Sequence, residues 1–210
     1  MLEEEITNSF SKELIKEAGL PLIKLPEQVN LKSGYLAFST TALINAKEVA
    51  EDSISKQSAN IVELVKAKIS QGQKVNCHVY SITHKYGILE TGRAEILKDK
   101  VVSSLRKEKI FCRRKGFDRS LPFIQVLVLA DRSVAVSVLN EKDMQTYHSV
   151  ISPYVGGFNN VEDDKKAPSR AFKKIVEAQE IMGTSISDGE VLVDLGACPG
   201  GWSYVARKRG

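Results

Sequence analysis

The sequence lacks the cysteine content of a disulfide-bonded protein and the cysteine spacing of a zinc-binding one. Its three cysteines, Cys77, Cys112 and Cys198, are far apart in 210 residues, and none belongs to a Cys-x-x-Cys pair. Cys77 and His78 are followed by His84, but successive strand residues point to opposite faces, whereas metal ligands need a shared one. We therefore expect neither a disulfide framework nor a metal site.

Long apolar runs and targeting segments are missing as well. No stretch of about 18 apolar residues occurs, as a membrane-spanning helix would need, and the acidic start over residues 1–5 is unlike a secretory or organelle signal. The composition, 42% hydrophobic and 27% charged, is typical of a soluble globular protein. We therefore expect no membrane partner and a cytoplasmic location.

What the sequence does have is an uneven distribution of charge. The first thirty residues carry six Glu against three Lys, a net of −3, whereas Lys98 to Arg119 carry nine basic residues against three acidic ones, a net of +6. Such a basic segment is typical of proteins that bind phosphate backbones. The alternative is a charged helix face with no binding role. The candidate phosphate-binding residues are Lys107, Lys109, Arg113, Arg114 and Lys115.

The N-terminal two thirds of the chain predict two small α/β units. Residues 1–72 show a helical pattern over 7–18, an alternating strand over 34–39, and a helical pattern over 45–69 that is one helix or two divided near Ser58. Residues 73–140 predict a strand over 74–82, a helix over 96–108, and a hairpin of 123–129 with 133–138. Glycine, proline and charge clusters over 141–168 then predict a loop and linker.

The last part, residues 169–210, predicts a helix, a strand, a glycine turn and a second helix. Ser169 is placed to cap a helix over 171–182, and an apolar strand over 191–196 ends in Asp194-Leu195-Gly196. The turn follows at 197–201, and a helix begins at Trp202. The overall fold class is therefore α/β, with α+β units first and the start of a Rossmann-like domain last.

This strand, turn and helix have the properties of a nucleotide-type cofactor site. In open α/β sheets the ligand lies beyond the carboxyl end of a strand, where the backbone must approach it closely. Gly196 and Gly200 lack Cβ atoms and can take positive φ, Pro199 stiffens the turn, and the next helix start offers unpaired N–H groups. Asp194 is placed to order the turn or to reach a cofactor amine through water. The spacing is neither G-x-G-x-x-G nor a P-loop.

The string from Asp194 to Trp202, Asp-Leu-Gly-Ala-Cys-Pro-Gly-Gly-Trp, resembles motif I of the FtsJ-type RNA 2′-O-ribose methyltransferases. It looks most similar to the methyltransferase M group, which modifies a cytidine ribose of bacterial large-subunit ribosomal RNA. The resemblance implies S-adenosylmethionine as cofactor and ribosomal RNA as partner. The cofactor-binding residues it implies are Asp194, Gly196, Ala197, Cys198, Pro199, Gly200, Gly201 and Trp202.

A second segment, Ala167-Pro168-Ser169-Arg170 and the helix that follows, resembles the part of the family that carries the first lysine of a Lys-Asp-Lys-Glu catalytic set. The resemblance assigns that role to Lys174, which would position or deprotonate the attacking ribose hydroxyl. A lysine can do so only if burial or a like charge lowers its pKa. Lys173 is assigned to solvent or RNA phosphate.

The family resemblance also bears on the rest of the chain. Relatives of this group carry a small α/β domain and a THUMP-type RNA-binding domain before the catalytic one, which implies that 73–140 is THUMP-like. The acidic residue after the second strand and three members of the catalytic set do not occur before Gly210. We therefore expect a C-terminally truncated and inactive chain whose full-length parent is the enzyme. The alternative is a module that only binds RNA through 98–119.

Overall fold

The computed structural model describes residues 39–50, 53–83, 87–89, 92–129, 131–158 and 161–209, together with the dipeptides Ile15–Lys16 and Ile23–Lys24. The chain forms two compact units, Met1–Phe158 and Asn159–Gly210. Each is described by itself below. Among the described residues, no helix is both long enough and apolar enough to cross a membrane.

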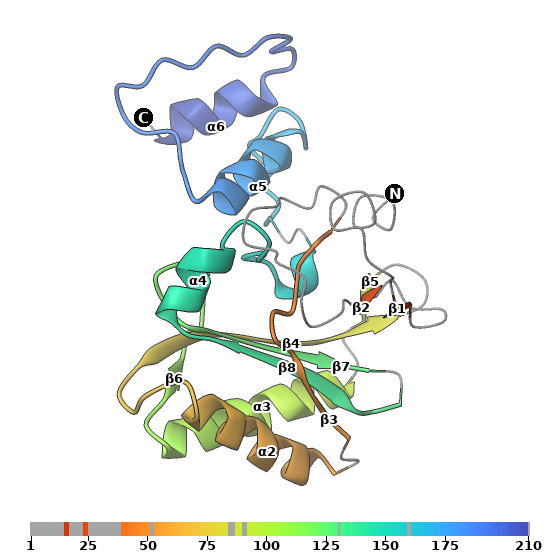
Figure 1. Ribbon diagram of the computed structural model, residues 1–210. Helices are drawn as coiled ribbons and strands as arrows, with labels where there is room; N and C mark the ends of the chain where they lie inside the picture. Colours follow the sequence, from red (N-terminus) through yellow and green to blue (C-terminus); the bar gives the residue numbers. More distant parts are fainter. Residues whose placement is uncertain are drawn as a thin grey trace. The chain divides into compact units, whose positions relative to one another are not determined.

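A mixed sheet forms the centre of the first unit (Figure 1). The strands run in the order β3 (Lys47–Val49), β8 (Val134–Leu139), β7 (Phe123–Val128), β4 (Lys74–Thr83) and β5 (Gly87–Leu89), and β6 (Phe111–Cys112) also pairs with β4. β4 runs parallel to both β7 and β6, whereas the β7–β8 pair is an antiparallel hairpin. The predicted strand at 74–82, the predicted hairpin and the mixed α/β class are confirmed.

Two helices, α2 (Ile54–Lys66) and α3 (Gly92–Lys107), cover one face of this sheet (Figure 1). Their apolar residues recur at helical spacing and pack against alternate residues of the strands, so both periodicities point into one core. The main members of this core are Ile61, Val65, Leu97, Val101, Leu105, Ile124, Val126, Val134 and Val136. The described part of 1–72 thus shares one sheet and one core with 73–140.

The opposite face is covered by α4 (Glu141–Tyr147) and by the segment that follows, which contains the 3-10 turn η2 (Val155–Gly157). Met144, Val150 and Ile151 are buried there with Phe123 and Leu139. The expectation of loop and linker throughout 141–168 is wrong at these elements. The reason is a capping box, in which Asn140 accepts from the Asp143 N–H and Asp143 accepts from the Asn140 N–H.

Three further expectations differ from the structure. The helix expected over 45–69 does not form over 45–50, because Lys47–Val49 pair with β8 as an edge strand. From Ile54 to Lys66 the helix is unbroken, which agrees with the alternative of one helix and not with a division near Ser58. The helix over 96–108 begins at Gly92. Of the helix over 7–18, only Ile15–Lys16 are described, and they form strand β1, which pairs with β2 (Ile23–Lys24). The strand at 34–39 lies outside the described residues except for Ser39.

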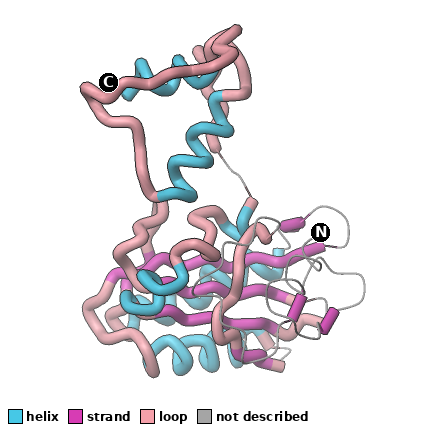
Figure 2. The backbone as a smooth tube through the Cα atoms, turned by 45° about the horizontal axis from the view of Figure 1, so that its top comes forward, coloured by secondary structure: helices cyan, strands magenta, loops and turns pink. Residues whose placement is uncertain are grey.

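The second unit contains α5 (Phe172–Met182) and α6 (Gly201–Arg209). Gly183, with φ 69°, ends α5 in the left-handed conformation, as predicted. The expected strand over 191–196 does not form, and Figure 2 shows loop throughout the connection between the two helices. A strand needs a neighbour to pair with, and Val191, Val193 and Leu195 are 92%, 75% and 92% exposed.

Candidate cofactor turn and basic surface

The carboxylate of Asp194 orders the turn that precedes α6. Its Oδ2 accepts hydrogen bonds from the backbone N–H of Ser203 at 3.2 Å and from the Ser203 hydroxyl at 2.8 Å. A negative charge at the first turn of a helix is favourable, because the N–H groups there lack intrahelical partners. Of the two roles expected for Asp194, the structure shows the ordering of the turn. Sequence reasoning did not identify Ser203 as its partner.

The glycines of the turn adopt the conformation that the sequence suggested. Gly196 has φ 85° and Gly200 has φ 91°, a region that residues with a Cβ rarely occupy. The peptide bond between Cys198 and Pro199 is cis, and the Cys198 side chain is exposed. A Cβ at Gly200 would lie 3.4 Å from the carbonyl oxygen of Ala197. The turn therefore leaves its backbone open at Gly196 and Gly200, while the side chains between them, including Cys198, are exposed.

The start of α6 packs closely against the start of α5. A Cβ at Gly201 would lie 2.5 Å from Ser169 Oγ, and the indole N–H of Trp202 donates to the carbonyl of Ala171 at 3.1 Å. Ser169 is not the N-cap, because α5 begins at Phe172 with Ala171 in the cap position. Within the described part of the chain, Ser169 Oγ is buried without a hydrogen-bond partner. A buried hydroxyl without a partner is unfavourable unless a ligand or water satisfies it.

Asp164 ties the segment before α5 to α6. Its Oδ2 accepts from Lys208 Nζ at 2.7 Å and from the Tyr204 hydroxyl at 2.8 Å, while Oδ1 accepts from the Lys166 N–H at 3.0 Å. The bond from Lys208, with those from Lys166 and Tyr204, lowers the pKa of Asp164 to about 2. The charged run around Asp164 was interpreted from sequence as linker, so this contact was missed.

An open hollow of about 380 Å³ lies beside these groups, lined by residues of the segment 163–170 and by Phe172. Asp163, Asp164, Lys165 and Arg170 line it together with Ser169. Two acids and two bases therefore border one space next to the unsatisfied Ser169 hydroxyl, on the side of the second unit where α5 begins.

The two lysines of α5 differ in environment. Lys173 is half-buried, and its Nζ lies 2.7 Å from Asp163 Oδ1, so it forms an ion pair where the sequence suggested solvent or phosphate. Lys174, the predicted catalytic lysine, is exposed. Ala171 and Ala178, on the same side of α5, are exposed as well. The described residues do not bury Lys174.

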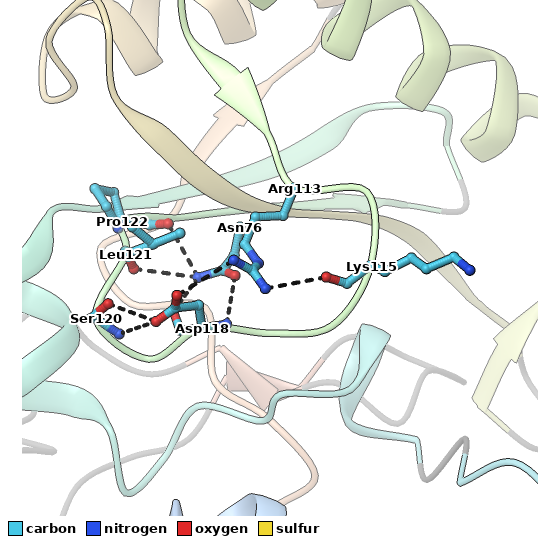
Figure 3. A network of polar contacts seen from close by, with 7 residues as sticks. All are labelled: Asn76, Arg113, Lys115, Asp118, Ser120, Leu121 and Pro122. Carbon is cyan, nitrogen blue, oxygen red and sulfur yellow. Dashed lines mark hydrogen bonds and ion pairs between the residues drawn. The ribbon is translucent and has the colours of Figure 1, made fainter.

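The five predicted basic residues, called the basic surface below, lie in the first unit around the end of α3 and in the loop after β6. Lys107 lies in the last turn of α3, Lys109 follows it, and Arg113, Arg114 and Lys115 lie in the loop after β6. All five side chains are exposed. Arg113 contacts Asp118 at 3.5 Å and the carbonyl of Lys115 at 3.4 Å, whereas Lys115 extends away from the loop (Figure 3).

Asn76 of β4 holds this loop in place (Figure 3). Its side-chain amide is buried and donates to the carbonyl of Asp118 at 2.8 Å, and its Oδ1 accepts from the Asp118 N–H at 3.0 Å. Weaker contacts reach the carbonyls of Leu121 and Pro122. Sequence reasoning treated Asn76 as an ordinary strand residue. The signal in the sequence is an asparagine, a residue that strands disfavour, within the alternating pattern of residues 74–82.

His78 and the two cysteines of this unit form no metal site. The His78 ring packs between Phe117 and Phe123, and its burial, with the charge of Lys98, lowers its pKa to about 4. Cys77 packs against the α2–α3 core, and its contact with the Cys112 thiol, followed by its burial, raises its pKa. His84 lies outside the described residues. Within the described ranges, no group of three or more His, Cys, Asp or Glu is placed to hold a metal ion.

Known proteins are similar to parts of this chain. Residues 167–210 match the model of the FtsJ-like methyltransferase family. "Ribosomal RNA large subunit methyltransferase M" from Proteus mirabilis is 33% identical over 113 residues, which cover 51% of this chain and 28% of that protein. The protein of the same name from Photorhabdus laumondii is 32% identical over 113 residues, with the same coverage. The one from Shewanella pealeana is 43% identical over 65 residues, covering 28% of this chain and 18% of that protein. The matches thus span less than a third of each relative's length.

Proposed function

We propose that this chain is part of an S-adenosylmethionine-dependent methyltransferase that modifies a ribose 2′-hydroxyl of ribosomal RNA in the cytoplasm. The observation that carries the proposal is the turn from Asp194 to Trp202, which combines the family match with two glycines at positive φ and a carboxylate-ordered helix start. The names of the relatives supply the class of substrate.

The described residues fit the cofactor at three points. Gly196 and Gly200 leave the turn open to close approach, and the start of α6 offers N–H groups suited to a carboxylate. The buried Ser169 hydroxyl lacks a partner and lies beside Gly201, so it is available to a bound ligand. When bound, S-adenosylmethionine supplies an electrophilic methyl group on a sulfonium. The residues proposed to hold it are Ser169, Asp194, Gly196, Ala197, Cys198, Pro199, Gly200, Gly201 and Trp202.

Lys174 is proposed as the residue that positions or deprotonates the attacking hydroxyl. A lysine acts as a base only when its neutral form is accessible, which requires removal from water or a like charge close by. Lys174 is exposed, and Val191 to Leu195 lack a strand partner within the described part of the second unit. We therefore propose that residues 1–210 bind the cofactor weakly and do not turn over by themselves.

Titration of the 15N-labelled chain with S-adenosylmethionine, followed by NMR, tests this proposal. We expect millimolar affinity, with shifts confined to the amide signals of 196–203 and to the indole N–H of Trp202, the single tryptophan. Gly200→Ala should abolish these shifts because φ 91° is strained for alanine. Gly189→Ala, at φ 82° in open space outside the turn, is the matched control and should retain them. If no signal shifts at any concentration, the proposal that the chain binds the cofactor is refuted. Micromolar affinity would instead refute the proposal that residues 1–210 bind it only weakly.

RNA binding by the first unit is proposed to use its basic surface, as a THUMP-like domain preceding the methyltransferase part at 169–210. Lys107, Lys109 and the basic triplet at 113–115 are all exposed, and Asn76 fixes the loop that presents the triplet. Binding through phosphates weakens steeply with salt. Replacing Arg113, Arg114 and Lys115 by glutamine should reduce both the affinity for a ribosomal RNA fragment and its salt dependence. Flat salt dependence of the unaltered chain would favour a charged surface without an RNA role.

The same surface supports a second candidate function, in which the chain only binds RNA. The observation in its favour is that the basic surface is complete within the described residues, whereas the cofactor segment is not paired into a sheet. Salt-dependent RNA binding together with no response to S-adenosylmethionine would favour this function over the first.

A further inference from the structure

Phe111 is a large aromatic side chain that the fold leaves exposed. It lies in β6, whose only pairing among the described strands is with the start of β4, and 44% of its surface is exposed. The next residue, Cys112, is paired in register with the fully buried Val75 and packs against the core under α2 and α3. Because strand neighbours alternate between faces, Phe111 points to the opposite face of the sheet.

Two basic residues are neighbours of Phe111 along and across the strands. Lys74 is its direct partner across the β4–β6 pair, and residues paired in register point to the same side. Arg113, two residues beyond Phe111, follows it along the chain, and the loop that continues through Lys115 is bonded to Asn76 at Asp118 (Figure 3). Lys74 is exposed. The exposed ring therefore has a basic neighbour in each of two segments, Lys74 in β4 and Arg113 after β6.

The nearby acids offset only part of this charge. Asp118 pairs with Arg113 at 3.5 Å and Glu108 pairs with Lys66 at 3.6 Å, while Glu141 accepts from Gln73, the residue before Lys74, at 3.2 Å. Lys74, Lys107, Lys109, Arg114 and Lys115 are exposed on the same end of the sheet. An exposed aromatic ring bordered by positive charge is the arrangement with which proteins bind unpaired nucleotides, because the ring stacks on a base while cations hold the phosphates.

We propose that Phe111 stacks on an unpaired base and that Lys74 and the 113–115 loop hold the flanking phosphates, so that the basic surface binds a single-stranded RNA segment. This inference rests on the proposed RNA-binding function and specifies its ligand. It also adds two residues, Phe111 and Lys74, to the surface expected from the sequence. Duplex RNA offers no exposed base face, so the ring distinguishes the two forms of RNA.

Fluorescence anisotropy of the full chain with a labelled single-stranded RNA, and with the same RNA in a duplex, tests the proposal. Phe111→Leu retains an apolar side chain but removes the stacking face. We expect it to lower the affinity for the single strand about 5- to 100-fold, with little effect on the duplex. Phe111→Tyr keeps a stacking ring and should bind the single strand as tightly as the unaltered chain. Ile96→Ala, which truncates another exposed apolar residue (58% exposed) in the first half of α3, is the matched control and should bind like the unaltered chain.

A second readout reports on stacking itself. RNA that contains 2-aminopurine should change its fluorescence on binding to the unaltered chain and to Phe111→Tyr, but not to Phe111→Leu. Equal affinities of Phe111→Leu and the unaltered chain for single strands would overturn the proposal, and so would an equal loss for both forms of RNA. If binding remains dependent on Arg113, Arg114 and Lys115 in that case, the proposed RNA function survives. No RNA binding by the unaltered chain would overturn both.

Exposed charge beside a short edge strand such as β6 also prevents edge-to-edge pairing of two chains. If this were the role of the surface, Lys74→Gln would promote self-association in sedimentation experiments and leave RNA affinity unchanged. That result would overturn the proposal as well. We expect Lys74→Gln to remain in the same oligomeric state and to lower the affinity for single-stranded RNA.

Discussion

Asn76 allows a quantitative prediction, because one buried side chain holds a whole loop. It is 2% exposed, makes two hydrogen bonds of good geometry with Asp118 at 2.8 and 3.0 Å, and makes two longer contacts at 3.4 and 3.5 Å. Truncation to alanine removes all four and leaves the Asp118 groups without this partner. With about 1 kcal/mol for each good bond and a further loss for unsatisfied groups, we expect Asn76→Ala to lower the free energy of unfolding by about 2–3 kcal/mol.

A loss of this size corresponds to a decrease in Tm of about 4–12 °C for a unit of this length. Far-UV circular dichroism during urea unfolding is the suitable measurement, since the single tryptophan lies in the second unit. Asn76→Asp keeps the shape of the side chain but places a carboxylate oxygen against backbone carbonyl oxygens. At pH 7 it should therefore lower the free energy of unfolding at least as much as Asn76→Ala. Ser120→Ala removes a single exposed bond of the same loop, from its hydroxyl to Asp118 Oδ1 at 2.6 Å, and should cost no more than about 1 kcal/mol. Equal losses for Asn76→Ala and Ser120→Ala would refute this role of the asparagine.

Two other substitutions have clear outcomes. Gly157→Ala should lower the free energy of unfolding of the first unit by more than about 2 kcal/mol, because φ is 80° and the new Cβ would overlap the Thr40 carbonyl. The control is Gly72→Ala, at φ 87° in open space, which should show only the cost of backbone strain in the same urea experiment. Equal losses for the two variants would contradict the overlap with Thr40. The Asp164 carboxyl should titrate with a midpoint near 2 in a carbon-detected NMR experiment, and Lys208→Met should raise that pKa. Because the pKa of Asp164 is lower in the folded chain than in the unfolded one, its ionised carboxylate stabilises the fold at pH values above the pKa of the unfolded chain, and this stabilisation is lost as pH falls through about 2. A midpoint near 4 in the unaltered chain would contradict the hydrogen bonds of Asp164 with Lys208, Tyr204 and Lys166.

The sequence predicts best where a local pattern and the tertiary structure agree. The alternation of β4 and the apolar run of β7 are confirmed because both strands lie between two covered faces. The glycines at 196 and 200 take positive φ, and α5 ends at Gly183, as their residue types suggest. In these cases the covalent geometry of the residue itself decides the backbone conformation.

The sequence predicts secondary structure least well where pairing with distant strands decides it. Lys47–Val49 lie in a segment with helical periodicity, yet pairing with β8 makes them a strand, and propensity is a weak determinant against such tertiary contacts. Conversely, Val191 to Leu195 have strand-forming residues but no ladder to join among the described residues. The start of α4 has a local signal in the sequence, because Asn140 and Asp143 have the spacing of a capping box. The exposure of Lys174 depends on packing that no local pattern encodes.

The parallel pairing of β4 with β7 has a consequence for when the basic surface takes shape. Asn76 is in register with Phe123, 47 positions further along the chain (123 − 76), and Lys107 to Lys115 all lie in the crossover between the two strands. Such a long loop closes slowly because chain entropy opposes it until the distant strand arrives. During synthesis the cationic residues therefore emerge before the strand that shapes their loop. The nascent chain carries their charge at once but acquires their arrangement only after β7 has been made.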